Sequence, residues 1–265
     1  MRDLAGKTVL LTGASTGLGP YIARRLRRAG ARFVLSARNE AALNQLATEL
    51  GDARVVAADL SRAGEAERLA HDAGAVDVLV SNAGIPASGR LTSLEVNQID
   101  RAIAVNLRAG IVLARELAPA MIERKAGHMV FMASTAGKVP TPSGTIYNAT
   151  KFGIRGFALA LREELYGTGV GVSTVAPTFV SGAGMWAETG QKASPIAGEV
   201  TPEQVAEAVF TAITKDKREI DVVRLPLRVS LRVLAIAPSL FMAVARSSGA
   251  NADVEKASER QKNKR

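Results

Sequence analysis

Three side chains that can transfer a proton or stabilise negative charge lie close together in the sequence: Ser134, Tyr147 and Lys151. Tyr147 and Lys151 are four residues apart, so on a helix their side chains would lie on one face. A nearby ammonium lowers the pKa of a phenol, which permits proton exchange near neutral pH. Ser134, from a separate element, would hydrogen-bond a carbonyl oxygen in the same place. The pattern indicates proton transfer at a carbonyl or alcohol, although this spacing also occurs on solvated helix faces.

The composition fits one large α/β domain. The chain has 265 residues, 47% of them hydrophobic, and no internal repeat is visible. The lack of cysteine excludes disulfides and thiolate metal sites. His71 and His128 have no metal-site spacing, so we expect no metal and interpret both as surface or structural residues. Residues 1–7 lack the apolar core of a signal peptide, which predicts a cytoplasmic protein.

The positive charge is unevenly distributed. The net charge is +9, and residues 218–265 alone hold 10 Lys and Arg against 5 Asp and Glu. Only 4% of the residues are aromatic and no nucleic-acid-binding motif is present, so we expect no nucleic-acid partner. An anionic membrane surface suits the basic segment better.

Apolar, β-rich runs alternate with helical patterns along most of the chain. The expected strands are Thr8–Leu11, Phe33–Ser36, Arg54–Ala57, Val76–Val80, His128–Ala133, Val170–Ala176 and Ile220–Val223. The expected helices are 18–29, 40–50, 62–73, 93–125, 145–166 and 202–214. This alternation predicts an α/β protein with a single doubly wound parallel sheet, the Rossmann fold, and helices on both faces. Ligands of such sheets bind beyond the carboxyl ends of the strands.

A glycine-rich turn, Thr12-Gly13-Ala14-Ser15-Thr16-Gly17-Leu18-Gly19, follows the first expected strand. Its glycines permit a tight turn and a close approach of the backbone to a ligand. Pro20 suits the first position of the next helix, whose free N–H groups attract a pyrophosphate. The spacing differs from Gly-x-Gly-x-x-Gly, and glycine-rich turns also occur for structural reasons alone.

The end of the second expected strand bears on the choice of dinucleotide. Enzymes that use NAD usually have Asp or Glu there, bonded to the ribose 2′-hydroxyl. This chain has Ser36-Ala37-Arg38. The guanidinium of Arg38 suits a 2′-phosphate, so we predict NADP (NADPH) as the cofactor. The alternative is that Arg38 only covers the solvent edge of the sheet.

These motifs, in this order, resemble those of the short-chain dehydrogenase/reductase family. Several independent motifs agree at compatible spacings, over about two-thirds of the chain. The matching positions are Thr12–Gly19, Asp59-Leu60, Asn82-Ala83-Gly84, Asn106, Ser134, Tyr147-x-x-x-Lys151 and Pro177.

The resemblance implies a dinucleotide site. Asp59 would meet the adenine amino group and Leu60 would contribute its backbone, although Asp59 or Ser61 would also suit a helix N-cap. The turn Asn82-Ala83-Gly84 would lie against the adenine ribose and steady the sheet. The expected cofactor-binding residues are Gly13, Ser15, Thr16, Gly17, Leu18, Gly19, Arg38, Asp59, Leu60, Asn82, Ala83, Gly84, Tyr147, Lys151, Pro177 and Val180.

The family commonly has Pro-Gly near the nicotinamide carboxamide, where this chain has Pro177-Thr178. Thr178 departs from the pattern and puts that contact in doubt. The Val180 backbone and the Ser181 hydroxyl remain candidates for it.

The resemblance also implies four catalytic residues. Ser134 would hydrogen-bond the substrate oxygen as negative charge develops, and Tyr147 would protonate it as general acid, or act as base in oxidation. Lys151 would bind the nicotinamide ribose and lower the pKa of Tyr147. Asn106 would hold a water of the proton relay through its backbone carbonyl, although a polar residue in an apolar helix often satisfies only a local hydrogen bond.

The domain organisation follows from the segments around these motifs. We expect a Rossmann-fold domain over 1–224, with a substrate lid over 182–200 that is rich in Gly, Ala and Ser. Met185 and Trp186 either close an apolar pocket there or pack on the core. Segments 88–94 and 138–145 complete the wall, and the apolar Val139 and Ile146 favour a lipophilic substrate.

An apolar and basic helical extension is expected over 225–248, followed by a charged, disordered tail over 249–265. Arg224, Arg228 and Arg232 would form one basic stripe on a helix, and these charges make the extension a poor transmembrane span. The extension either lies peripherally on the inner face of an anionic membrane or covers the core, a subunit interface or the substrate pocket; we favour the second interpretation.

We therefore expect an NADP-dependent oxidoreductase that interconverts a ketone and a secondary alcohol. A 3-oxoacyl-thioester reductase is the second hypothesis, and a non-catalytic NADP-binding regulator recruited to a membrane is the third. A sugar epimerase or dehydratase fits less well, because such relatives carry a larger substrate region. Family members usually form dimers or tetramers, so we expect a homodimer or homotetramer built on helices 93–125 and 145–166.

Overall fold

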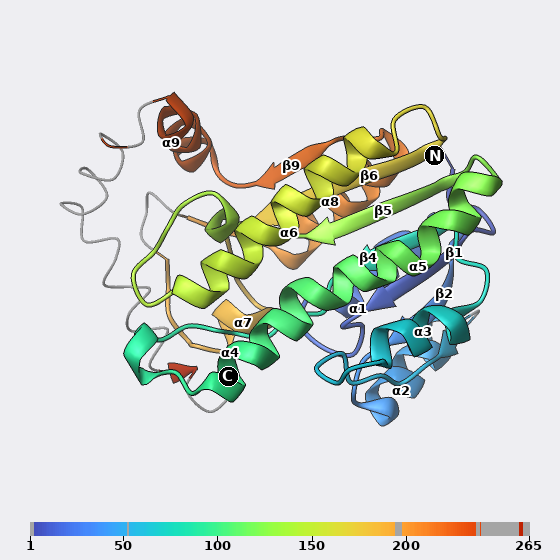
Figure 1. Ribbon diagram of the computed structural model, residues 1–265, viewed down its shortest axis with the longest axis horizontal. Helices are drawn as coiled ribbons and strands as arrows, with labels where there is room; N and C mark the ends of the chain where they lie inside the picture. Colours follow the sequence, from blue (N-terminus) through green and yellow to red (C-terminus); the bar gives the residue numbers. More distant parts are fainter. Residues whose placement is uncertain (1–2, 52, 194–197, 237–238, 240–259, 262–265) are drawn as a thin grey trace.

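Seven parallel strands form the centre of the protein in the computed structural model (Figure 1). Their order is β3-β2-β1-β4-β5-β6-β9, so the chain runs outward from β1, returns to β4 and runs outward the other way. This is the predicted doubly wound sheet, and its switch point lies between β1 and β4. The structure describes residues 3–51, 53–193, 198–236, 239 and 260–261. The predicted tail 249–265, apart from residues 260–261, and the end of the 225–248 extension lie outside the described residues.

All seven predicted strands are present. They are β1 (Thr8–Thr12), β2 (Arg32–Ser36), β3 (Ala53–Val55), β4 (Val78–Ser81), β5 (Gly127–Met132), β6 (Val170–Pro177) and β9 (Glu219–Val222). Two further short strands, β7 (Phe179–Val180) and β8 (Glu199–Val200), pair in parallel on either side of the predicted lid. The lid therefore leaves and rejoins the domain at one small sheet.

The helices agree with the predicted ones in order but not in every boundary. They are α1 (Gly19–Arg27), α2 (Glu40–Leu50), α3 (Glu65–Ala73), α4 (Val96–Ile103), α5 (Ala109–Glu123), α6 (Thr145–Glu164), α7 (Gly184–Ala187), α8 (Pro202–Thr214) and α9 (Leu225–Ile236). The helix predicted over 62–73 starts only at Glu65, because Asp59 and Ser61 bond to each other in a turn and Gly64 has a left-handed φ of 82°. Neither Asp59 nor Ser61 therefore caps a helix.

The single helix predicted over 93–125 is also wrong in detail. Leu91–Ser93 form a short 3-10 turn, α4 follows, and a π-helical segment, Ala104–Arg108, separates α4 from α5. A capping box between Glu95 and Gln98 starts α4, and it sets the helix start three residues later than predicted.

Hydrophobic side chains on the two faces of the sheet form two cores. Helices α1, α2 and α8 cover one face, and α3, α5 and α6 cover the other; α5 and α6 lie in front of the strands in Figure 1. Along β1, Val9 and Leu11 pack into the first core and Leu10 into the second, as the alternation along a strand requires. Burial on both faces explains why the strands are continuous apolar runs in the sequence.

The edge strand β9 is held by a network of partly buried charges. Lys138, in the loop after Ser134, lies 2.9 Å from Glu219 and 2.6 Å from Asp221. Arg155 of α6 donates to Glu219 at 2.6 Å. Burial alone would raise the pKa of Glu219, but the hydrogen bonds from Arg155 and Lys138 outweigh it and lower that pKa to about 2. The network fixes the loop after Ser134 against β9.

His128 on β5 is fully buried. Its Nε2 lies 2.8 Å from the Ser173 hydroxyl, and its Nδ1 lies 4.0 Å from Asp216. Burial lowers the pKa of His128 to about 3, against the attraction of Asp216. His71, by contrast, has a side chain that is 90% exposed. The interpretation of the two histidines as surface and structural residues is confirmed.

We predict that acid destabilises the fold through His128. An unfolded histidine titrates near 6.5, so between pH 6.5 and 3 the unfolded state binds a proton that the folded state does not. The stability present above pH 6.5 is therefore lost as the pH falls, by about 2 kcal/mol between pH 7 and pH 5. Urea unfolding should show a smaller loss over that range for His128→Gln and an unaltered loss for His71→Gln. An equal loss in all three proteins would contradict the prediction.

Candidate active site

The turn between β1 and α1 has no room for side chains at two of its glycines. A Cβ on Gly13 would lie 2.8 Å from the Cα of Ala83, and one on Gly19 would lie 2.2 Å from the Gly13 carbonyl oxygen. Gly13 and Gly17 also have left-handed φ angles of 63° and 60°, which glycine adopts without steric cost. The turn thus packs closely against the turn that follows β4.

The start of α1 is suited to an anion. Leu18 is the N-cap residue, and no side chain among the described residues caps this end. Pro20 lies in the first turn, as predicted, and the predicted residues Ser15 and Thr16 lie in the turn that leads to it. The first N–H groups of a helix have no partner within it, and with the helix dipole they favour negative charge. These features fit the pyrophosphate of a dinucleotide.

The turn after β4 is bonded directly to β1. The Thr12 hydroxyl accepts hydrogen bonds from the backbone N–H groups of Asn82 and Ala83, each at 3.0 Å. The Asn82 side chain donates to the carbonyls of Thr12 and Gly13, each at 3.1 Å. Asn82 therefore has the structural part of its expected role, because it closes the switch point of the sheet.

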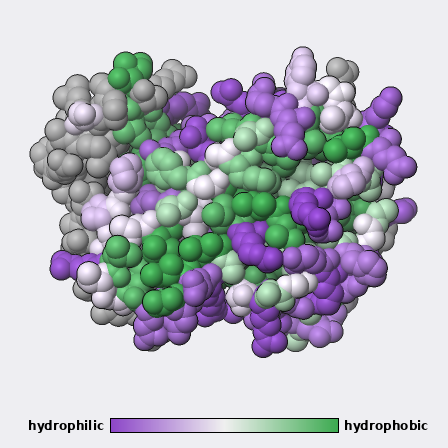
Figure 2. Space-filling view, viewed as in Figure 1, coloured by the Kyte–Doolittle hydropathy of each residue, from purple (hydrophilic) through white to green (hydrophobic). Residues whose placement is uncertain are grey.

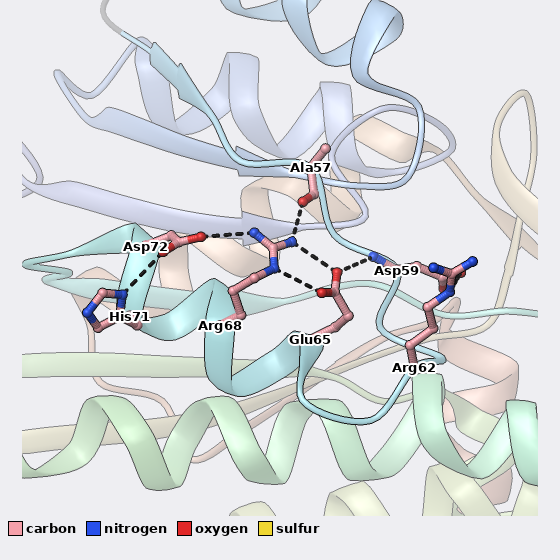
Figure 3. Close-up of polar contacts among 7 residues, drawn as sticks. All are labelled: Ala57, Asp59, Arg62, Glu65, Arg68, His71 and Asp72. Carbon is pink, nitrogen blue, oxygen red and sulfur yellow. Dashed lines mark hydrogen bonds and ion pairs between the residues drawn. The ribbon is translucent and has the colours of Figure 1, made fainter.

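Asp59 follows β3, where α3 fixes its backbone (Figure 3). Glu65 accepts a hydrogen bond from the Asp59 amide at 3.2 Å and two from the Arg68 guanidinium, each at 2.9 Å. Arg68 also donates to the Ala57 carbonyl at 2.7 Å. The hydrogen bonds from Arg68 lower the pKa of Glu65 to about 2. Glu65 and Arg68, for which the sequence predicted no role, together hold the segment that carries Asp59.

Arg38 and Asp59 come together at the ends of β2 and β3. Burial alone would raise the pKa of Asp59, but hydrogen bonds from Ser61 and the positive charge of Arg38 lower it. The buried hydroxyl of Ser36, at the end of β2, has no hydrogen-bond partner among the described residues. Leu60 is buried beside Asp59. An exposed guanidinium, a carboxylate and an unpaired hydroxyl at one corner fit the adenosine part of a dinucleotide.

Asn106 lies in the π-helical segment, and its buried amide is bonded to the loop after Gly84. Its Oδ1 accepts from the Ile85 N–H at 2.7 Å, and its Nδ2 donates to the Ile85 carbonyl at 3.0 Å. The Thr150 hydroxyl of α6 lies 3.5 Å from the same Nδ2. The side chain satisfies local hydrogen bonds, as the alternative interpretation expected. The relay role of its backbone carbonyl stays a prediction, and π segments are frequent at functional sites.

The hydroxyl groups of Ser134 and Tyr147 meet at the end of β5. Ser134 precedes a 3-10 turn; its Oγ accepts from the Ala136 amide at 3.1 Å and donates to the Pro177 carbonyl at 3.4 Å. Tyr147, in the first turn of α6, lies close enough to the Ser134 hydroxyl for that group to affect the pKa of the phenol. Burial raises the pKa of Tyr147, and the Ser134 hydroxyl lowers it by less. The two predicted catalytic hydroxyls are therefore adjacent.

Lys151 lies one turn beyond Tyr147 but contacts it only through the ring. Its Nζ is 5.7 Å from the centre of the Tyr147 ring and donates to the Met132 carbonyl at 2.8 Å. Burial lowers the pKa of Lys151 to about 8. The role of Lys151 in lowering the pKa of Tyr147 stays a prediction; in this arrangement burial of the phenol raises that pKa. A solvated helix face is excluded, since Lys151 is buried.

Asn148, which the sequence did not single out, connects two parts of the candidate site. Its amide donates to the carbonyls of Ala136 and Val139 at 2.6 and 2.9 Å. Its Oδ1 accepts from both the amide and the hydroxyl of Thr141. Asn148 thus holds the loop after Ser134 against the helix that carries Tyr147. In the sequence, only its position next to Tyr147 points to Asn148, and that position does not predict the hydrogen bonds to the loop after Ser134.

Predicted wall segments 88–94 and 138–145 are joined to each other. The Gly89 amide donates to the Ser143 carbonyl at 2.6 Å, and Ser143 has a left-handed φ of 57°. Beyond β6, the Thr178 amide donates to the Val222 carbonyl of β9, and the Ser181 hydroxyl donates to the Val200 carbonyl at 3.2 Å. Because the Ser181 hydroxyl is used there, the backbone of the buried Val180 is the better of the two carboxamide candidates.

The lid helix α7 lies between the glycine-rich turn and the turn after β4. A Cβ on Gly17 would lie 3.3 Å from the Cα of Gly184. A Cβ on Gly84 would lie 3.5 Å from the terminal methyl of Met185 and 3.9 Å from the Lys151 Nζ. Met185 therefore reaches the expected catalytic residues, as one of its two predicted roles required.

Trp186 packs on the core of the domain, which is the second of the two roles predicted for Met185 and Trp186. Its ring lies 4.0 Å from that of Phe179, measured between centroids, and its Nε1 donates to Glu199 at 3.1 Å. The side chain is buried against β7 and β8. The indole thus holds α7 at the small sheet while Met185 faces the site.

The chain is similar to known oxidoreductases over most of its length. A family model described as short chain dehydrogenase matches residues 7–194. The ketoacyl reductase HetN of Nostoc sp. (strain PCC 7120) is 39% identical over 245 residues, which cover 89% of this chain and 85% of that protein. The family-model match includes the glycine-rich turn and the Ser134–Lys151 region.

Two solved structures are similar in fold as well as in sequence. A metagenomic short-chain oxidoreductase in complex with NADP has 36% identity and a TM-score of 0.71, covering 83% of this chain and 97% of that one. The actinorhodin polyketide ketoreductase with NADPH has 31% identity and a TM-score of 0.74, covering 84% and 97%. With the family match and the residue pattern at the strand ends, these similarities establish that the chain belongs to the short-chain dehydrogenase/reductase family.

Proposed function

We propose that this protein is an NADP-dependent oxidoreductase that interconverts a ketone and a secondary alcohol. The observation that carries the proposal is the contact of Ser134 with Tyr147 beside the buried Lys151, near the helix start that lacks a side-chain cap. These groups place a hydroxyl donor, a phenol and an ammonium in one small volume. The dinucleotide, when bound, would supply or accept the hydride.

The side chains favour the reductive direction. The Ser134 hydroxyl would hydrogen-bond the substrate oxygen as negative charge develops, and Tyr147 would give that oxygen a proton. The raised pKa of Tyr147 keeps the phenol protonated at neutral pH, which is the form that a general acid needs. Lys151 has N–H groups beyond the one given to Met132 and would bind the ribose of the nicotinamide. Asn106 would hold the water that resupplies the proton.

The cofactor proposal depends on Arg38. This guanidinium lies near Asp59 at the corner where the adenosine ribose would sit, and its fork suits a 2′-phosphate. The metagenomic oxidoreductase was solved with NADP and the actinorhodin ketoreductase with NADPH. These similarities support NADP rather than NAD.

A second candidate function is the reduction of 3-oxoacyl thioesters. Two of the similar proteins are named ketoacyl reductase and polyketide ketoreductase. A long acyl chain would suit the apolar wall that Val139 and Met185 border. Activity on 3-oxoacyl thioesters, compared with simple ketones of equal chain length, separates this candidate from the broader one. The third hypothesis, a non-catalytic regulator, requires an inactive Tyr147 and is addressed by the same assay.

We also propose that α9 contacts an anionic membrane surface without spanning it, and is not the cover over the core, a subunit interface or the pocket that the sequence favoured, because four of its apolar residues are exposed. Leu225, Val229, Val233 and Ile236 recur along α9 with exposed fractions of 71%, 52%, 40% and 86%. Arg228 is exposed beside Val229, which gives the apolar stripe a basic flank. Leu231, on the same helix, is buried. The described residues include no helix long and apolar enough to cross a bilayer.

A homodimer or homotetramer remains our proposal for the assembly. Figure 2 shows hydrophobic residues gathered on the face where α4, α5 and α6 lie. Val96 of α4, Ile122 of α5 and Phe152 of α6 are 73%, 38% and 41% exposed. An interface on these helices would bury such residues, and the mass in solution from light scattering tests it.

We predict that Tyr147→Phe lowers kcat for NADPH-dependent carbonyl reduction by about 10²- to 10⁴-fold, because the general acid is lost. NADPH affinity should hardly change, since the ring remains. The measurement is NADPH absorbance with a panel of ketones and 3-oxoacyl thioesters. Tyr166→Phe is the matched control, because Tyr166 is 88% exposed on the surface. Near-normal turnover by Tyr147→Phe would refute the mechanism.

We predict that Arg38→Asp shifts the ratio of kcat/KM for NADPH over NADH by about 10- to 100-fold toward NADH, the size expected for a charged hydrogen bond to phosphate. Arg62→Asp is the control, because Arg62 forms an ion pair with Asp59 at 3.7 Å and the substitution makes the same change of charge. If both variants shift the ratio alike, the overall positive charge near Asp59, and not a specific bond from Arg38, sets the cofactor preference. An unchanged ratio in Arg38→Asp would remove Arg38 from the site.

We predict that the full chain floats with phosphatidylserine-containing vesicles and not with phosphatidylcholine vesicles. Val229→Glu should abolish flotation by placing a charge in the apolar stripe, and Val96→Glu on α4 should leave it intact. Higher salt should weaken flotation, because it screens the attraction of the arginines. Equal behaviour of the two variants, or no flotation of the unsubstituted chain, would rule out α9 as a membrane contact.

A further inference from the structure

Two residues near the end of the printed sequence contact the lid. Arg260 donates from Nη1 to the Thr189 carbonyl at 2.6 Å, and Gln261 donates from Nε2 to the Met185 carbonyl at 2.9 Å. These partners are 71 and 76 residues away in sequence. In Figure 1 the short red segment that holds the pair lies near the label C. We call Arg260 and Gln261 the 260–261 pair.

The pair bonds carbonyls at the end of a very short helix. In a continuing α-helix the Thr189 amide would bond the Met185 carbonyl, but here it donates to Trp186 at 2.9 Å. The last carbonyls of a helix need partners from outside the helix, and side-chain N–H groups of basic residues commonly supply them. Gln261 provides a donor for Met185, and Arg260 provides one just beyond the helix. The contacts therefore stabilise α7 where its own backbone does not.

The position of α7 decides what these contacts could control. Gly184 is packed on the glycine-rich turn beside Gly17, and the Met185 side chain lies beside Gly84 and Lys151. The Met185 carbonyl is thus held by Gln261, while its side chain lies beside Gly84, which Lys151 also approaches. Any outward movement of α7 would break the bonds to the 260–261 pair and open the site at the same step.

We infer that Arg260 and Gln261 are positioning residues that clamp α7 over the dinucleotide and substrate site. The inference rests on the proposed function for what lies beneath α7, but the clamp itself is a property of the fold. A neutral hydrogen bond, such as that from Gln261, changes an equilibrium by about fivefold, and one from a charged guanidinium, such as that from Arg260, by more. Loss of both donors should therefore raise the open fraction of the lid by at least about 25-fold.

The chain contains its own probe of this movement. Trp186 is the single tryptophan of the sequence and lies within α7. It is only 8% exposed, stacked on Phe179 and bonded to Glu199. Opening of α7 would expose the indole to solvent, which raises its quenching by acrylamide and shifts its emission to longer wavelength. This readout needs no substrate and no turnover.

The test compares three full-length variants with the unsubstituted chain by acrylamide quenching. Arg260→Ala with Gln261→Glu removes both donors and, through the glutamate, repels the Met185 carbonyl without a change in side-chain size. Arg260→Lys alone keeps a donor and the charge, so it should keep most of the protection. Arg265→Glu changes the net charge by as much as the double variant does and is the electrostatic control. Quenching should rise for the double variant and not for the control; unaltered quenching in the double variant would overturn the clamp.

Kinetics then separate the clamp from the proposed function. If the clamp positions the lid for carbonyl reduction, the double variant should raise KM for the carbonyl about tenfold with little change in kcat, because the catalytic hydroxyls are untouched. Raised quenching with an unchanged KM would overturn that positioning role. If no substrate is turned over by any variant, the proposed function fails, and the quenching result still decides whether the 260–261 pair holds α7.

Discussion

The hydrogen bonds between Thr12 and the turn after β4 are the constraint on which the site depends. Strands β1 and β4 are neighbours whose following segments leave in opposite directions, so their carboxyl ends would separate unless something joined them. The Thr12 hydroxyl joins them by accepting two backbone N–H groups, and Asn82 returns two bonds to β1. Without that hydroxyl two inward-facing donors would lack partners, at a cost of about 1–3 kcal/mol each. The same closeness leaves no space for a side chain at Gly13.

The catalytic half of the site depends on buried polar groups whose hydrogen bonds are satisfied. Asn106 is bonded to both backbone groups of Ile85, and Lys151 is bonded to the Met132 carbonyl. Asn148 uses its whole amide on the loop after Ser134. An unpaired polar group in such surroundings is costly, so these bonds specify one arrangement of α6, the loop after Ser134 and the π segment. Tyr147 is held in place by this framework and not by its own contacts alone.

The sequence was sufficient for the sheet and for the proximity of Tyr147 and Lys151, because both rest on local patterns. Strands buried on two faces are unbroken apolar runs, and the four-residue spacing places Tyr147 and Lys151 on one helix face. The sequence could not predict features that depend on contacts between residues far apart in the chain. The π segment at Asn106 depends on Ile85, the role of Asn148 depends on a loop whose path is unknown beforehand, and the start of α3 depends on a turn at Asp59. The effect of burial on the pKa of Tyr147 could not be predicted for the same reason: the spacing indicates a neighbouring charge, whereas burial, which raises this pKa, is a property of the finished fold.

Burial acts on both titratable groups of the site in the direction of neutrality. It raises the pKa of Tyr147, so the phenol stays protonated. It lowers the pKa of Lys151 to about 8, so the ammonium loses its proton more easily than it would in water. In the proposed reaction, negative charge that develops on the ketone oxygen would meet the Ser134 hydroxyl, the Tyr147 phenol and the Lys151 ammonium, which their surroundings hold in place. The terminal methyl of Met185 lies near Gly84, next to Lys151, and adds an apolar group to these surroundings. The burial that keeps the phenol protonated would therefore also strengthen the stabilisation of that charge.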